Sequence, residues 1–387
     1  MYLKQFFYWS IAVLSLNTAF ADDEIPDPLK ILGEDVTVES WVEKGRPATL
    51  KIFSEQVYGV TPKKKVSSEW KLDRESGALN GTAIRREYLL TLDGSLTARV
   101  LIYLPKGKKS VSVFMGLNSG GNQTLEKDEW ITASGSSERG KSSQRWPLAK
   151  LIQNGRGLVT VHCADFDPDK DDGFKNGVHA LFPSERDGKS WGTFGAWAWG
   201  MSRVLDHLAS VSEIDEKRVA VIGFSRLGKA ALWAGAQDER FAMVVSNNSG
   251  CGGAALSKRA QGETVGKITK SFPHWFCGNF ARYAGKEAEM NFDQHQLIAC
   301  IAPRPVYVAS ASKDKWADPE GEFLSLVHAA PVYALFKDAP FEGELWPKPG
   351  VAIGGQAMFY HLREGGHNIT PWDWTRYVQV SKRLLGE

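Results

Sequence analysis

The chain has 387 residues, of which 43% are hydrophobic, and it carries a formal net charge of +2. A chain of this length can bury a large core, and its small net charge gives no field that would draw it to nucleic acid or to an anionic membrane surface. We therefore expect no nucleic-acid partner. The chain also has 14 tryptophans, and proteins that bind carbohydrate often place a few of these against sugar rings.

The first 21 residues have the pattern of a secretory signal peptide. Lys4 precedes an apolar run that extends to about Leu16, and Ala19-Phe20-Ala21 matches an A-x-A cleavage site. This run is shorter than the roughly 20 apolar residues that a membrane span requires, so we expect no membrane anchor. The mature chain is predicted to begin near Asp22 and to work in the periplasm or outside the cell.

The remaining residues, 22–387, show the patterns of one α/β domain, in which the segment to about residue 80 is an N-terminal extension. Two alternating stretches flank the turn Asp93-Gly94 and predict a hairpin. Further on, buried-strand patterns and helical spacings of apolar residues follow one another. This order predicts a mostly parallel central sheet with helices on both faces, a three-layer αβα sandwich. The predicted elements are strands at 83–94, 96–105, 110–122 and 157–169, a helix at 192–210, a strand at 217–225, a helix at 226–236, and strands at 241–250 and 303–314.

Polar side chains that could carry chemistry follow several of these strands. Ser225 ends one strand, Asp314 and Asp318 follow another, and His367 lies in a Gly-rich loop before the last helix. Active sites of such sheets lie beyond the carboxyl ends of the strands, and the order Ser, acid, His is that of the α/β-hydrolases. A serine hydroxyl becomes a good nucleophile when an imidazole takes its proton and a carboxylate orients that imidazole. The plainer alternatives are a helix N-cap for Ser225, turn formers for the aspartates and a loop residue for His367.

The segment GFSRLGKAALWAGAQDERF, residues 223–241, resembles the nucleophile segment of the glucuronoyl esterases, carbohydrate esterase family 15, whose motif is G-x-S-R-x-G-K. The resemblance implies an α/β-hydrolase fold and covers most of the chain from about residue 40. It continues through GLNSGGNQT (116–124), GAWAWGMSRVLDHL (195–208), SGCGGAALSKRAQGET (249–264), IAPRPVYVASASKDKWADPEGEF (301–323) and GGHNIT (365–370).

The resemblance also implies roles for individual residues. Ser225 matches the nucleophile, His367 the general base, and Arg226 the arginine that helps to stabilise the oxyanion. The positions that hold the hydroxyl groups of the sugar are matched by Lys229, Gln237, Glu263 and Trp316. Without the resemblance, Lys229 and Gln237 would be read as an exposed helix surface.

The chain departs from the family pattern at the acid. Many members carry a glutamate in the sequence NESG, whereas this chain has NNSG with Asn248 in that place. An amide can orient a histidine, but it cannot stabilise an imidazolium by charge. The carboxylate is therefore expected from Asp314, with Asp318 as the alternative.

The four cysteines lack a C-x-x-C pair, and no motif indicates a metal, so we expect no metal and no cofactor. In an oxidising compartment Cys251 and Cys277 are the first candidates for a disulfide, and four buried thiols are the alternative.

The activity that the resemblance implies is the hydrolysis, through an acyl-enzyme, of esters between glucuronate (4-O-methyl-glucuronate of xylan) and lignin alcohols. Its substrate would be glucuronoxylan or a lignin–carbohydrate ester, and we expect a monomer. The alternatives are another carbohydrate esterase, such as an acetyl xylan esterase, and a catalytically impaired binding homologue.

Overall fold

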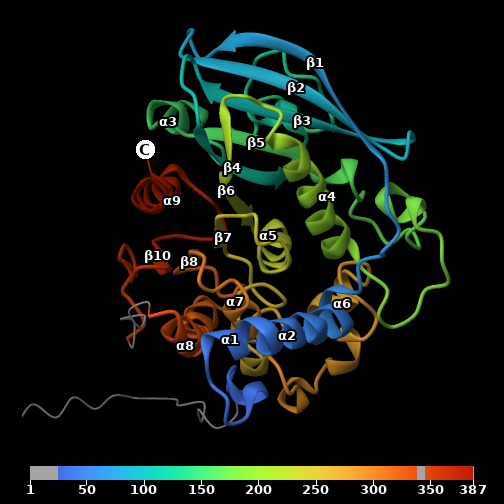
Figure 1. The fold of residues 1–387 in the computed structure, drawn as a ribbon, viewed down its shortest axis with the longest axis vertical. Coiled ribbons are helices and arrows are strands. Elements are labelled where there is room, and N and C mark those ends of the chain that lie inside the picture. The colour runs from blue at the N-terminus through green and yellow to red at the C-terminus, as the bar shows by residue number, and fades with distance from the viewer. Residues whose placement is uncertain (1–24, 338–344, 387) are drawn as a thin grey trace, which may run out of the picture.

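The computed structural model describes residues 25–337 and 345–386, so the predicted signal peptide lies outside the described residues. Its central feature is a ten-stranded sheet with the strand order β1-β2-β3-β5-β4-β6-β7-β8-β10-β9 (Figure 1). The strands are β1 (Ser68–Ala78), β2 (Ala83–Leu92), β3 (Leu96–Pro105), β4 (Val111–Asn118), β5 (Gly157–His162), β6 (Ile214–Phe224), β7 (Met243–Asn247), β8 (Val306–Ala311), β9 (Ala352–Gly354) and β10 (Met358–Arg363).

Most of this sheet is parallel, as the sequence predicts. The pairings β5–β4, β4–β6, β6–β7, β7–β8 and β8–β10 are all parallel. Antiparallel pairings occur toward the two edges, among β1, β2, β3 and β5 on one side and between β10 and β9 on the other. The predicted hairpin is present, with Leu92 of β2 opposite Leu96 of β3. The segment before residue 80 supplies β1, which extends the sheet at this edge.

Helices cover both faces of the sheet because successive strand residues point to opposite sides. In β6, Val221 belongs to one apolar cluster and Ile222 to the other. The first cluster includes residues of α4, α5, α7 and α8, and the second includes residues of α3 and α9, which lie on opposite sides of the strands in Figure 1. The helices are α1 (Val38–Ser40), α2 (Arg46–Phe53), α3 (Leu148–Gln153), α4 (Thr193–Leu208), α5 (Arg226–Gln237), α6 (Val265–Ser271), α7 (Gln294–Ala299), α8 (Pro319–Leu335) and α9 (Pro371–Leu385). Within the described ranges, no helix has both the length and the apolar character needed to cross a bilayer.

The predicted disulfide between Cys251 and Cys277 is wrong, because all four cysteines are buried free thiols. The two side chains lie in different surroundings. Cys251 Sγ is 3.8 Å from the hydroxyl oxygen of Ser257, whereas Cys277 Sγ is 3.7 Å from the backbone oxygen of Glu55. Burial raises the pKa of Cys251 to about 12 and raises that of Cys277, which keeps both thiols protonated. The alternative of four buried thiols therefore describes the chain.

Candidate active site

Ser225 occupies a strained turn between β6 and α5. Its backbone has φ 59° and ψ −129°, in the left-handed half of conformational space, and its side chain makes no capping hydrogen bond to α5. A Cβ atom at Gly223 would overlap the carbonyl group of Leu227, so the turn requires glycine there. Strain of this kind is typical of the strand–turn–helix that exposes a nucleophile in α/β-hydrolases. The geometry argues against the simple N-cap alternative for Ser225.

The structure brings Ser225, His367 and Asp314 into one hydrogen-bonded series. The Ser225 hydroxyl oxygen is 2.8 Å from His367 Nε2, and His367 Nδ1 is 2.6 Å from Asp314 Oδ2. His367 lies between β10 and α9, and Asp314 follows β8, so loops at the same end of the sheet supply all three groups. With a proton on Nδ1, the imidazole donates to the carboxylate and offers Nε2 to the serine, which is the arrangement that a general base needs.

Asn248, at the position where the sequence departs from the expected family pattern, contacts Asp314 rather than His367. Its side-chain amide donates to Asp314 Oδ2 at 2.7 Å, and its backbone N–H donates to the carbonyl oxygen of Ala309 in β8 at 2.7 Å. Asp314 is 5% exposed. The amide therefore helps to fix the carboxylate that faces His367.

The alternative acid, Asp318, forms its hydrogen bonds with residues other than His367. Its carboxylate accepts a hydrogen bond from Arg259 Nε at 2.9 Å and one from the backbone N–H of Gly321 at 3.1 Å. It is the N-cap residue of α8 and has a left-handed backbone angle φ of 49°. Asp318 thus anchors the start of a helix and an ion pair.

A buried carboxyl group that sequence reasoning missed, Glu322, lies behind the acid. Its Oε1 accepts hydrogen bonds from the backbone N–H groups of Ser249 at 2.6 Å and Gly250 at 3.0 Å, and its Oε2 accepts one from the Ser310 hydroxyl at 2.6 Å. Burial raises the pKa of Glu322 to about 8. The side chain ties α8 to β8 and to the loop that carries Asn248.

Arg226 is held beside Ser225 by partners that are distant in sequence. One guanidinium nitrogen donates to Asp169 Oδ2 at 2.6 Å, and the guanidinium carbon lies 4.6 Å from the centre of the Trp275 ring. Asp169 also accepts hydrogen bonds from His274 and Trp275, at 3.0 and 2.6 Å. Burial favours the protonated form of Asp169, but these hydrogen bonds and the charge of Arg226 outweigh it and hold its pKa below its usual range. The fixed carboxylate orients the arginine at the start of α5.

Three of the four predicted sugar-binding residues meet in one pocket next to Ser225. Lys229 Nζ donates to Glu263 Oε2 at 2.6 Å, and Trp316 Nε1 donates to Glu263 Oε1 at 3.1 Å. Trp316 is 51% exposed, and Lys267 Nζ lies 5.4 Å from the centre of its ring. The pocket has a volume of about 190 Å³ and is lined by Ser225, Arg226, Lys229, Asn248, Ser249, Gly250, Glu263, Phe272, Trp275, Trp316, Ala317 and His367.

The prediction for Gln237 is wrong. Gln237 is exposed, it does not line this pocket, and it ends α5, which begins at the site with Arg226. A helix of 12 residues is about 18 Å long, so its last residue lies far from its first. In the parts of the chain that the structure describes, no group of three or more His, Cys, Asp or Glu side chains is placed to hold a metal ion.

Comparison with known proteins agrees with this geometry. A family model described as "Glucuronyl esterase, fungi" matches residues 149–336. The fold is similar to a solved promiscuous esterase of carbohydrate esterase family 15 from a marine bacterial metagenome, with a TM-score of 0.86 and 39% identity over 93% of this chain and 96% of that one. A curated carbohydrate esterase from an unknown prokaryotic organism is 40% identical over 92% of this chain and 88% of that protein. The chain belongs to carbohydrate esterase family 15.

The esterase therefore has the α/β-hydrolase fold and is a carboxylic ester hydrolase. It is also similar to the glucuronoyl esterase from Solibacter usitatus, with a TM-score of 0.86 and 37% identity over 94% of this chain and 98% of that one. The resemblance found in the sequence is thus confirmed at the level of the family and the fold.

Proposed function

We propose that this esterase hydrolyses the ester between the C6 carboxyl group of a glucuronate unit and an alcohol. The observation that carries the proposal is the hydrogen-bonded series Ser225–His367–Asp314 at the edge of a pocket whose polar groups include Lys229 and Glu263. The likeness to a structure of a glucuronoyl esterase supports the same substrate class.

In the first half of the reaction, His367 Nε2 takes the proton of Ser225 as the serine oxygen attacks the C6 carbonyl carbon. The Asp314 carboxylate at Nδ1 stabilises the imidazolium that forms. The negative charge on the carbonyl oxygen faces the Arg226 guanidinium and the free N–H groups that begin α5. When the intermediate collapses, the bond from C6 to the alcohol oxygen breaks, and His367 gives its proton to the leaving alcohol.

In the second half, a water molecule replaces the alcohol. His367 takes a proton from the water, whose oxygen attacks C6 of the acyl-enzyme. The bond between C6 and the serine oxygen then breaks, Ser225 recovers its proton from His367, and free glucuronate leaves. Each proton that His367 accepts is returned, so the enzyme ends as it began.

The pocket offers the groups that a sugar ring needs. The Lys229 ammonium has three N–H groups, of which the Glu263 carboxylate and the Cys251 carbonyl oxygen accept two, and Glu263 is an acceptor that Lys229 and Trp316 orient. The exposed part of the Trp316 side chain can cover an apolar face of the sugar. A pocket with these charged groups favours a uronate as the acyl group. An acetyl esterase would instead require a small acyl pocket. The complete Ser225–His367–Asp314 series argues against an impaired binding homologue.

The natural substrate that we propose is glucuronoxylan whose 4-O-methyl-glucuronate units are esterified to lignin alcohols. The pattern of residues 1–21 supports export to the periplasm or the exterior, where such a polymer would be met.

The proposed activity is tested by hydrolysis of benzyl glucuronate, with acetylated xylan as the competing substrate. We expect release of benzyl alcohol by the wild type, no release by Ser225→Ala, and labelling of Ser225 by a fluorophosphonate. Faster release of acetate than of benzyl alcohol would overturn the proposal in favour of an acetyl esterase. A folded wild type in which Ser225 stays unlabelled would indicate a binding protein.

A further inference from the structure

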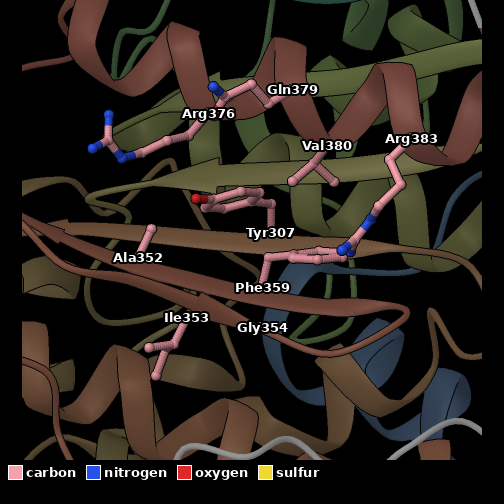
Figure 2. Close-up of a pocket in the computed structure, with 9 residues that line it drawn as sticks. All are labelled: Tyr307, Ala352, Ile353, Gly354, Phe359, Arg376, Gln379, Val380 and Arg383. Carbon is pink, nitrogen blue, oxygen red and sulfur yellow. The ribbon is translucent and has the colours of Figure 1, made fainter.

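A second, larger cavity lies away from the triad, at the β9 edge of the sheet. It has a volume of about 370 Å³ and separates β9 from α9. We call it the edge cleft. Figure 2 shows its floor, formed by the rings of Tyr307 and Phe359, with the Arg383 side chain reaching down to Phe359 and the Arg376 guanidinium pointing away from both rings. The edge cleft is lined by Tyr307, Ala352, Ile353, Gly354, Phe359, Arg376, Gln379, Val380 and Arg383.

Two arginines of the edge cleft are fixed in place without a carboxylate partner among the described residues. Arg376 donates to the carbonyl oxygen of Trp372 at 3.1 Å, with its guanidinium carbon 3.0 Å from the centre of that ring. Arg383 donates to the carbonyl oxygen of Gly355 at 2.9 Å and lies 4.8 Å from the centre of the Phe359 ring. Each guanidinium is therefore oriented but not neutralised.

Several other arginines of this chain form ion pairs. Arg86, Arg240 and Arg259 each contact two carboxylates. The acid nearest in sequence to Arg376 is Asp373, and its two oxygens are engaged by His361 at 2.8 Å and by Arg363 at 3.1 Å. Within the part of the chain that the structure describes, the edge cleft is therefore a place where positive charge has no ion pair, as is also the case at Arg145 and Arg304.

Arg376 also carries a polar atom that lacks a partner. Its Nε is buried and has no hydrogen bond to any described residue, so a ligand would contact the terminal nitrogens; burial lowers the pKa of the group against the opposing effect of the nearby Asp373 charge. A guanidinium that has lost part of its hydration gains from an anion, and its planar set of donors matches the two oxygens of a carboxylate. The two arginines are seven residues apart, so they lie on one side of α9 about 10 Å from each other.

We propose that the edge cleft is a second carbohydrate site, which binds the free carboxylate of a uronate unit on a polysaccharide. Gln379 lies between the two arginines along α9 and offers an amide to sugar hydroxyl groups. The proposal rests on the proposed function, because hydrolysis of glucuronoyl esters leaves free uronates on the polymer. The edge cleft would then hold a partly de-esterified chain while the triad acts on another unit.

The test measures binding to de-esterified glucuronoxylan and to neutral arabinoxylan in the Ser225→Ala background. Arg376→Gln and Arg383→Gln are added together, and the control adds Lys106→Gln and Lys108→Gln, which remove the same two charges from the exposed turn after β3. We expect about a tenfold weaker affinity of the cleft variant for glucuronoxylan, since each lost guanidinium removes a charge-assisted contact. Binding to arabinoxylan and binding by the control variant are expected to stay unchanged.

Equal glucuronoxylan affinity in the cleft and control variants would overturn the proposal, as would an equal loss on arabinoxylan. With Ser225 restored, both variants are expected to hydrolyse benzyl glucuronate at the wild-type rate, which shows that they fold. A failure of the proposed function would appear in a different measurement. The wild type would then not hydrolyse benzyl glucuronate, whereas binding of glucuronoxylan to Ser225→Ala could still be measured.

Discussion

Asp314→Asn removes one negative charge from beside His367 and keeps the shape of the side chain. The carboxylate oxygen lies 2.6 Å from His367 Nδ1. The carboxylate side chain is 4% exposed, whereas the imidazole is 42% exposed, so solvent partly screens the interaction. With an effective dielectric constant of about 20 to 40, Coulomb's law gives about 3 to 6 kcal/mol for the stabilisation of the imidazolium. We therefore expect kcat to fall by about two to four orders of magnitude.

The assay is the rate of benzyl alcohol release from benzyl glucuronate at saturating substrate, with circular dichroism to show that each variant is folded. Asp318→Asn is the matched control, because it removes an aspartate that contacts Arg259 rather than His367. We expect it to lower the melting temperature and to change kcat only a few-fold. A large loss of kcat in Asp318→Asn together with a small one in Asp314→Asn would refute the assignment of the acid.

A substitution of Asn248, combined with Asp314→Asn, tests the same assignment of the acid. Asn248 Nδ2 is 2.7 Å from the carboxylate oxygen of Asp314, so a carboxylate at position 248 would lie close to the imidazole. We expect Asn248→Asp to restore part of the activity of Asp314→Asn, and Asn248→Ala to restore none. Equal activity of the two double variants would show that charge is not what Asp314 supplies.

Two further predictions concern buried charges. Burial raises the pKa of Glu322 from its usual value near 4.5 to about 8. Between these two pH values the folded state holds a proton that the unfolded chain releases. The free energy of unfolding therefore falls as the pH rises from about 4.5 to about 8. Urea unfolding at several pH values is expected to show a flatter profile in Glu322→Gln, and an unchanged slope would contradict this. Lys229→Met leaves Glu263 buried without its cation, which is expected to cost about 3 to 5 kcal/mol in the free energy of unfolding. Urea unfolding of the double variant Lys229→Met/Glu263→Gln is expected to recover most of that loss, and no recovery would argue against the ion pair as its cause.

The strands that position the site could be predicted because their apolar runs are continuous. Ser225 and Asp314 each follow such a run, and all residues of β7 and β8 are buried. β1 could not be predicted in the same way, because it is an edge strand in which most residues are exposed and only one is buried. β10 was missed because it mixes apolar residues with His361 and Arg363, whose burial depends on Asp373 of α9.

The site was predictable to the extent that its residues follow strand ends or match a family motif. Asp169, which orients Arg226, was not, because 57 positions separate the two in sequence and only the folded chain brings them together. The wrong prediction of Gln237 as a sugar-binding residue has a similar origin. A motif gives the positions of residues in the sequence of α5, but it does not give the distance between the active site and the last residue of the helix.

The hydrogen bond between Asn248 and Asp314 has an evolutionary consequence. β7 and β8 are neighbours, and the side chains that follow them share one contact. A descendant with a carboxylate at both positions would keep its histidine supported, because two carboxylates this close share a proton. If either acid were then lost, the other would still support the histidine. The proposed acid can therefore pass from one strand to the next during divergence, through intermediates that are all active.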